Sequence, residues 1–142
     1  YKTNKTVLTA SNIDIKTGKL TYETKLIYLN ENYNIDTSKQ IKKHDIIISM
    51  SSGSLKHLGK VAYIQDDMEY MIGGFLSIIR CKNEKIAFAL YNRLMSKKFR
   101  EYVFSKKGQN INNLKMTELS KQKIYLPVDI DKFYLEQKEH ID

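Results

Sequence analysis

The sequence predicts an α+β fold in which a mixed β-sheet packs against helices. Short apolar runs typical of strands occupy much of the first half of the chain, for example "DIIISM" and "GGFLSIIRCK". From Glu84 onward, apolar residues recur at helical spacing instead. A later run, "KIYLPV", returns to the strand pattern. Strands, then a helix, then a returning strand is an order typical of an α+β domain with a mixed sheet.

The first third of the chain predicts two extended segments joined by a turn. Weak alternation of apolar and polar residues indicates an extended segment over residues 6–15, and Gly18 marks the turn that follows. The run "LTYETKLIYL", residues 20–29, is rich in β-branched and aromatic residues, so we expect one strand there. The polar stretch after it, residues 30–45, predicts a loop with room for one helical turn.

The middle of the chain predicts three apolar strands. Residues 45–50, "DIIISM", form a short continuous apolar run, which is typical of a strand buried on both faces. A segment rich in serine and glycine leads from it to a second strand, "KVAYIQ". The polar stretch "DDMEYM" is predicted to be a link, and residues 73–82 are predicted to be a strand that Gly73 and Gly74 enter.

One long helix or two consecutive helices should follow Glu84. The apolar stripe of Ile86, Leu90 and Leu94 is expected to face the core. Beyond it, Lys97, Lys98 and Arg100 are consistent with the solvated last turn of a helix, where the helix dipole favours cations. Gly108 breaks the pattern. A short helix over "KMTELSKQ" and a strand closed by Pro127 then precede a helix capped by Asp129 or Asp131.

The positive charge of the chain is concentrated in its body. The 142 residues, enough for one domain, carry a net charge of +8. Five carboxylates and two lysines give residues 128–142 a net charge of −3, so residues 1–127 carry +11. A basic body followed by an acidic segment fits a nucleic-acid-binding surface. A lysine-rich composition without a binding role is the alternative explanation.

Several classes of protein are disfavoured by what the sequence lacks. No apolar run reaches the roughly 18 residues that a membrane-spanning helix needs. The single cysteine, Cys81, cannot form an internal disulfide, so we expect a buried strand residue and a cytoplasmic protein. The three histidines are scattered without metal-ligand spacing, and no nucleotide-binding glycine turn or nucleophile motif is present. We therefore expect no catalytic residue, no metal and no cofactor. The start "YKTNKTVL", without Met, indicates a piece of a larger protein.

Several segments, in order, resemble one known family. They are "VLTASNIDIKTGKL", "IKKHDIIISMSSGSLKHLGKVAYI", "GGFLSIIR", "LMSKKFREYVF", "GQNINNLKMTELSKQKIYLP" and "FYLEQKEHI". Together they resemble a target recognition domain of the specificity (S) subunit of type I restriction-modification systems. Similar domains occur at the C-terminal ends of single-chain type II restriction-methylation enzymes. The sequence does not distinguish a domain of that kind from one of a separate S subunit. The resemblance covers nearly the whole chain.

The resemblance implies a mixed, strongly bent β-sheet with packed helices, ending in the start of a spacer helix. Residues 1–128 would form a DNA-recognition domain, and residues 129–142 would begin a spacer and dimerisation helix. Such a domain reads one half of a bipartite sequence in double-stranded DNA. Methyltransferase (M) and restriction (R) subunits would be its partners and would carry the catalysis, and the C-terminal helix would allow self-association. A protein-interaction scaffold whose basic face is incidental, or a nuclease, are the rival functions.

Two loops hold the candidate DNA contacts. Small hydroxyls and exposed amides bind phosphate, and lysine adds positive charge. The first loop contributes Ser51, Ser52, Ser54, Lys56, His57 and Lys60, while Gly59 is expected to serve backbone geometry. The alternative is a flexible hairpin loop with solvated lysines.

The second loop follows the predicted helix. Its lysines would hold phosphate, and its amide side chains have the paired donor and acceptor that can read an adenine edge in the major groove. The residues are Lys106, Lys107, Gln109, Asn110 and Asn112. Turn formation through local backbone hydrogen bonds is the alternative role for the asparagines.

Overall fold

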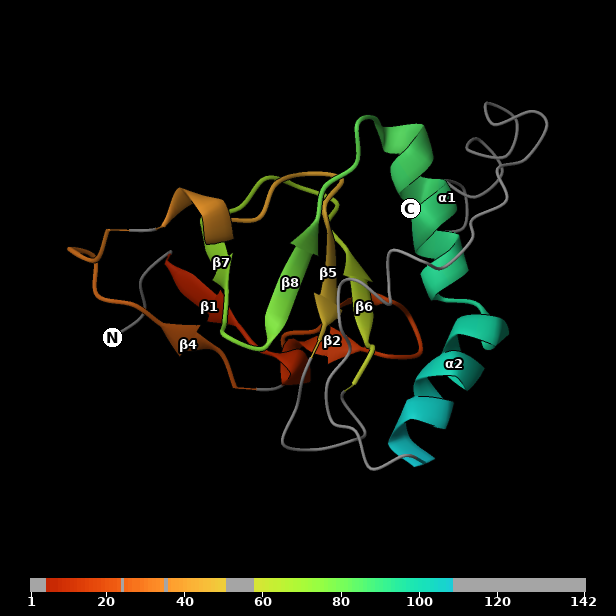
Figure 1. Ribbon diagram of the computed structural model, residues 1–142. Helices are drawn as coiled ribbons and strands as arrows, with labels where there is room; N and C mark the ends of the chain where they lie inside the picture. Colours follow the sequence, from red (N-terminus) through yellow and green to blue (C-terminus); the bar gives the residue numbers. More distant parts are fainter. Residues whose placement is uncertain (1–4, 24, 35, 51–57, 109–142) are drawn as a thin grey trace.

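The structure, a computed structural model, describes residues 5–23, 25–34, 36–50 and 58–108 (Figure 1). Eight short strands precede two helices in these ranges, and two 3-10 turns, Ala10–Asn12 and Thr37–Lys39, lie among the strands. The elements are β1 (Thr6–Leu8), β2 (Ile13–Asp14), β3 (Lys19–Leu20), β4 (Ile27–Tyr28), β5 (Ile46–Ser49), β6 (Val61–Tyr63), β7 (Tyr70–Ile72), β8 (Leu76–Ile79), α1 (Glu84–Leu94) and α2 (Lys97–Gly108). Neither helix of the described ranges is long and apolar enough to cross a membrane.

The described strands pair into three small sheets. Strands β6, β5 and β8 form an antiparallel sheet with β5 in the centre. Strand β1 pairs antiparallel with β4 and parallel with β7, which makes the second sheet mixed. Strands β2 and β3 form a hairpin around Gly18. The predicted α+β class with mixed strand pairing is confirmed.

The central strand β5 separates two apolar cores. Ile46 and Ile48 face one core, which they share with residues of α1 and α2. Ile47 faces the other core, together with Leu8 of β1 and Ile72 of β7. Every residue of β5 is buried, as the continuous apolar run predicted. The helices therefore cover one face of the sheet and the β1 sheet covers the other, an arrangement visible in Figure 1.

The helical half of the described chain consists of two consecutive helices. Asn83 caps α1, because its side-chain oxygen accepts a hydrogen bond from the Ile86 amide at 2.9 Å. The buried face of α1 is Ala87, Phe88, Ala89, Tyr91 and Leu94. Of the predicted stripe, Leu94 is buried, whereas Ile86 and Leu90 are only half-buried at its border. After α1 ends, the Ser96 hydroxyl accepts a hydrogen bond from the Phe99 amide at 3.2 Å, which starts α2.

Several sequence predictions were wrong because they considered only neighbouring residues, whereas the strands are defined by partners distant in sequence. The predicted single strand over residues 20–29 is split, since Leu20 pairs with Ile13 while Ile27 pairs with Val7 on a different sheet. The predicted polar link over residues 66–71 leads into β7, which pairs in parallel with β1. Residues 6–15 include a 3-10 turn between β1 and β2.

Two further details of the predicted third strand need correction. Gly73 and Gly74 form the turn between β7 and β8 instead of entering a strand directly. Cys81 follows β8 and is half-buried, and burial raises the pKa of its thiol. The predicted short helix, the returning strand, the C-terminal helix and the 128/129 boundary all lie outside the described residues.

Candidate nucleic-acid interface

The ends of the segment rich in serine and glycine are fixed to the sheet. The Ser49 amide donates to the Lys60 carbonyl at 2.9 Å, and the Gly59 amide donates to the Ser49 carbonyl at 2.9 Å. Leu58 is fully buried in the core beneath the helices. Both ends of this hairpin therefore emerge from ordered backbone. The candidate residues Ser51, Ser52, Ser54, Lys56 and His57 lie outside the described residues.

Gly59 serves backbone geometry, as predicted. Its φ of 76° is in the left-handed region, which favours glycine. A Cβ at this position would lie 2.7 Å from a methyl carbon of Val103 on α2. The Arg100 guanidinium donates to the Gly59 carbonyl, and burial lowers the pKa of that guanidinium. Helix α2 is thus docked directly against the end of the hairpin.

Lys60 already has an intramolecular partner. Its side chain is half-buried, and Nζ donates to the Ile13 carbonyl at 3.0 Å, which joins β2 to the start of β6. Contact between Lys60 and DNA stays a prediction, and this hydrogen bond would compete with it. Lys60 is the one candidate of the first loop that the structure describes.

Lys97, Lys98 and Arg100 lie at the beginning of α2, not in the last turn of a helix as the sequence suggested. Lys97 and Lys98 are exposed, and the first turn of α2 contains no acidic residue. Cations near a helix N-terminus oppose the helix dipole, typically by about 0.3–1 kcal/mol each. Lys97 and Lys98 therefore do not stabilise the helix. A bound anion would offset the unfavourable interaction between these lysines and the helix dipole.

The last turn of α2 carries the second candidate pair, Lys106 and Lys107. Their backbone belongs to the helix, and their side chains are outside the described part of the structure. Gln109, Asn110 and Asn112 follow it and are also not described. The predicted break at Gly108 coincides with the last residue of α2. Because Arg100 and Val103 of α2 meet Gly59, the helix that leads to the second loop lies beside the base of the first.

An exposed aromatic residue at the same end of the sheet was missed. Phe75 lies in the β7–β8 turn with 63% of its surface exposed, and its carbonyl accepts a hydrogen bond from the Met50 amide at 3.0 Å. In the sequence it belongs to an apolar run, which predicts burial. The signal that could have revealed it is the preceding Gly73-Gly74 pair, since paired glycines mark turns.

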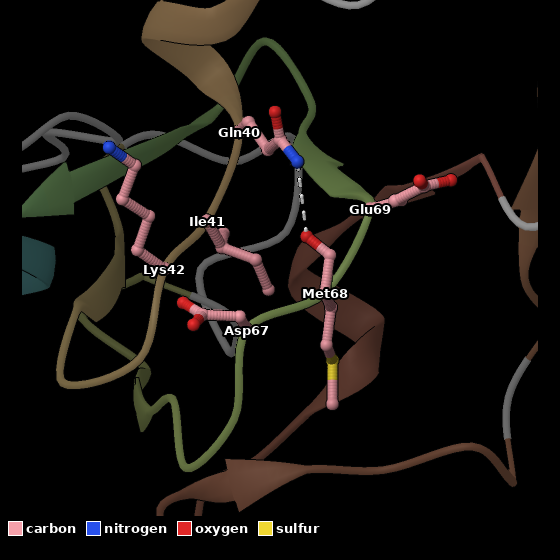
Figure 2. A pocket seen from close by; sticks show the side chains of 6 residues that line it. All are labelled: Gln40, Ile41, Lys42, Asp67, Met68 and Glu69. Carbon is pink, nitrogen blue, oxygen red and sulfur yellow. Dashed lines mark hydrogen bonds between the residues drawn. The ribbon is translucent and has the colours of Figure 1, made fainter.

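The opposite end of the sheet contains an open cleft of about 420 Å³ (Figure 2). It lies where β5 begins and β6 has ended, and Gln40 closes one side by donating to the Met68 carbonyl at 3.4 Å. The carboxylate of Asp67 accepts a hydrogen bond from the Lys43 amide at 2.9 Å, and Glu69 is nearby in the lining. Two carboxylates against one lysine, Lys42, give the lining a net negative charge, which disfavours phosphate. No group of three histidine, cysteine, aspartate or glutamate side chains that could hold a metal occurs among the described residues.

A fixed hairpin base beside a cationic helix points to the class of domains that bind a polyanion at their surface. The chain belongs to the family of type I restriction modification DNA specificity domains, whose family model matches residues 2–142. It is 32% identical over 117 residues to the type I restriction enzyme EcoKI specificity subunit of Escherichia coli (strain K12). That match covers 80% of this chain and 24% of the subunit, so the chain spans about a quarter of its relative's length. The resemblance seen in the sequence is confirmed.

Proposed function

We propose that this chain recognises one half of a bipartite sequence in double-stranded DNA for a restriction-modification enzyme. The observation that carries the proposal is the match of the DNA specificity family over nearly the whole chain. The net charge of +11 in residues 1–127 and the cationic first turn of α2 support it. The relative is named as a specificity subunit of a type I restriction enzyme, which supports the same role.

The proposed interface divides the work between charge and amide groups. Lys56, Lys106 and Lys107 would neutralise phosphates, with Ser51, Ser52, Ser54 and His57 donating hydrogen bonds to them. Gln109, Asn110 and Asn112 would read base edges from the second loop. Phosphate contacts position the domain and base contacts supply specificity, so both loops are needed.

Catalysis would belong to partners. Methyltransferase and restriction subunits would bind the domain, and the helix proposed to begin at residue 129 would provide the docking or self-association surface. The chain itself would supply no catalytic residue and no cofactor, and it would act in the cytoplasm where its DNA is.

We expect the chain to bind duplex DNA with an affinity that falls steeply with salt. Dissociation constants near 10⁻⁶–10⁻⁴ M at physiological salt are typical of binding through phosphate alone. Lys56→Ala and Lys107→Ala should each reduce the slope of log affinity against log salt by about one unit, because each removes one phosphate contact. Fluorescence anisotropy of a labelled duplex over a salt series measures the slope.

Lys82→Ala is the matched control for these lysine variants. Lys82 is exposed and follows β8, at the opposite end of the sheet from the hairpin, so the same loss of charge should leave the slope nearly unchanged. Equal flattening by all three variants would show that only net charge matters. An affinity that is the same at low and physiological salt would contradict the proposed DNA interface.

Removal of residues 129–142 should leave DNA binding intact or slightly stronger. This segment carries a net charge of −3, which repels phosphate. The truncated and full chains are compared by anisotropy with the same duplex, after circular dichroism has shown that both are folded. A large loss of DNA affinity in a folded truncated chain would contradict the assignment of this segment to protein contacts.

A further inference from the structure

The turn between β7 and β8 presents Phe75 on a backbone that is tied down on two sides. The Gly73 amide donates to the Leu8 carbonyl at 2.9 Å, which joins the turn to β1. The Leu76 amide closes the turn by donating to the Gly73 carbonyl at 3.2 Å, and Met50 binds the Phe75 carbonyl from the β5 side. Because these hydrogen bonds already fix the backbone, a contact made by the Phe75 side chain requires no further ordering of the turn.

The neighbours of this turn place Phe75 at the same end of the sheet as the base of the first loop. Leu76 pairs with Ser49 on β5, and Ser49 is in turn bonded to Lys60 at the start of β6. Two strand spacings, roughly 10 Å, therefore separate the Phe75 turn from Lys60. The starts of β8 and β6 and the C-terminal end of α2 all lie toward the lower side of Figure 1.

A duplex seated on this end would reach the turn. The major groove is about 12 Å wide, comparable with the separation of Phe75 and Lys60. Lysines can bind the phosphates of the duplex, but the phosphates offer no apolar surface for the exposed benzyl ring of Phe75. Bases offer what suits it: the thymine methyl group in the major groove, and the faces of partly unstacked bases.

We propose that Phe75 contacts the bases of the bound duplex and adds an apolar, salt-independent share to its affinity. The inference rests on the proposed DNA binding and adds a residue that neither loop contains. It also predicts a signature that separates Phe75 from the lysines. Loss of the ring removes no charge, so the number of counterions released on binding is unchanged.

The test is binding of duplex DNA by the full chain carrying Phe75→Ala, measured by anisotropy over a salt series. We expect roughly tenfold weaker binding at every salt concentration, with the salt slope of the unmodified chain, because contacts between aromatic side chains and bases are typically of this size. Phe75→Leu should recover part of the affinity, since it restores apolar surface. The fold should be unaffected, because the ring is largely exposed.

Tyr33→Ala is the matched control. Tyr33 is an aromatic residue with 49% of its surface exposed, and its carbonyl is bound by Lys5, which precedes β1. It therefore lies beyond the end of β1 opposite to Leu8 and the Phe75 turn. Its loss should not change DNA affinity.

The outcomes separate this inference from the function on which it rests. If the unmodified chain binds DNA and Phe75→Ala binds equally well, the inference is wrong and the proposed function stands. If Phe75→Ala changes the salt slope as the lysine variants do, the ring acts through the phosphate contacts and the inference is also wrong. If the unmodified chain binds no duplex, both fail together.

Discussion

Arg80→Ala is expected to lower the free energy of unfolding by about 3 kcal/mol, because it leaves a buried carboxylate without its cation. Asp45 is 1% exposed, and Arg80 binds both of its oxygens, with Nε 2.8 Å from Oδ1 and Nη2 2.7 Å from Oδ2. The hydrogen bond to Asp45 raises the pKa of the guanidinium. Removing one partner of a buried pair typically costs 3–5 kcal/mol, and the lower end applies because 45% of the Arg80 side chain is exposed.

Urea unfolding followed by circular dichroism measures this loss. Lys82→Ala, which removes an exposed cation two residues further on, should change the free energy of unfolding by less than about 0.5 kcal/mol. In the Arg80→Ala background, Asp45→Asn should restore part of the stability, since it removes the uncompensated charge. If Asp45→Asn instead lowers the free energy of unfolding by the same amount in the Arg80→Ala chain as in the unmodified chain, the two residues are not coupled.

Gly18→Ala is expected to be similarly damaging, with a loss of roughly 2–4 kcal/mol from left-handed backbone and overpacking together. Gly18 has a φ of 64°, and a Cβ there would lie 2.0 Å from the hydroxyl oxygen of Tyr91. That hydroxyl donates to the Gly18 carbonyl at 2.9 Å, and burial raises the pKa of Tyr91 to about 12, so it remains a donor at neutral pH. The tyrosine cannot simply swing away, because its ring is 5.5 Å from the ring of Tyr63 in the core.

Gly74→Ala is the control for glycine loss, since a Cβ at Gly74 would meet nothing within 4 Å. It should change stability by no more than about 0.5 kcal/mol. Tyr91→Phe removes the clashing oxygen, so Gly18→Ala should be less damaging in a Tyr91→Phe chain than in the unmodified one. Full additivity of the two changes in denaturant unfolding would show that the predicted clash does not occur.

The elements that sequence reasoning predicted correctly are those specified by neighbouring residues. Three consecutive isoleucines begin the run Ile46–Ser49, and it forms a strand buried on both faces. The predicted turn at Gly18 is a hairpin turn with Gly18 in the left-handed region, and the predicted helix begins at Glu84, where Asn83 provides the cap. In each case the determining interaction lies within a few residues along the chain.

The elements that were missed depend on partners distant in sequence. Tyr70–Ile72 becomes a strand because it pairs with β1, more than sixty residues earlier, and nothing in the polar stretch before it indicates this. Leu20 and Ile27 belong to different strands because their partners lie on different sheets. Of the two alternatives that the sequence left open after Glu84, the structure has two consecutive helices, with Ser96 at the start of the second.

In the candidate interface, too, residue types could be recognised from the sequence, whereas contacts between distant residues could not. Lysines and serines were recognisable by residue type, but the sequence did not indicate that Lys60 would bind the Ile13 carbonyl. Phe75 was hidden in an apolar run, and only the pairing of β8 with β5 places it beside the hairpin. The proposed roles of Lys107 and Gln109 depend on the second loop and stay predictions.

The central claim is that this domain distinguishes DNA sequences, and selection from a random duplex library tests it most directly. The chain is incubated with duplexes that contain a randomised central segment, bound molecules are recovered at physiological salt, and their sequences are compared with the input. We predict enrichment of one short motif, with each altered base pair costing roughly 1–3 kcal/mol of binding free energy in follow-up competition. Recovery of duplexes whose sequences match the input, from a chain that nevertheless binds DNA, would contradict sequence recognition and leave only a non-specific DNA-binding domain.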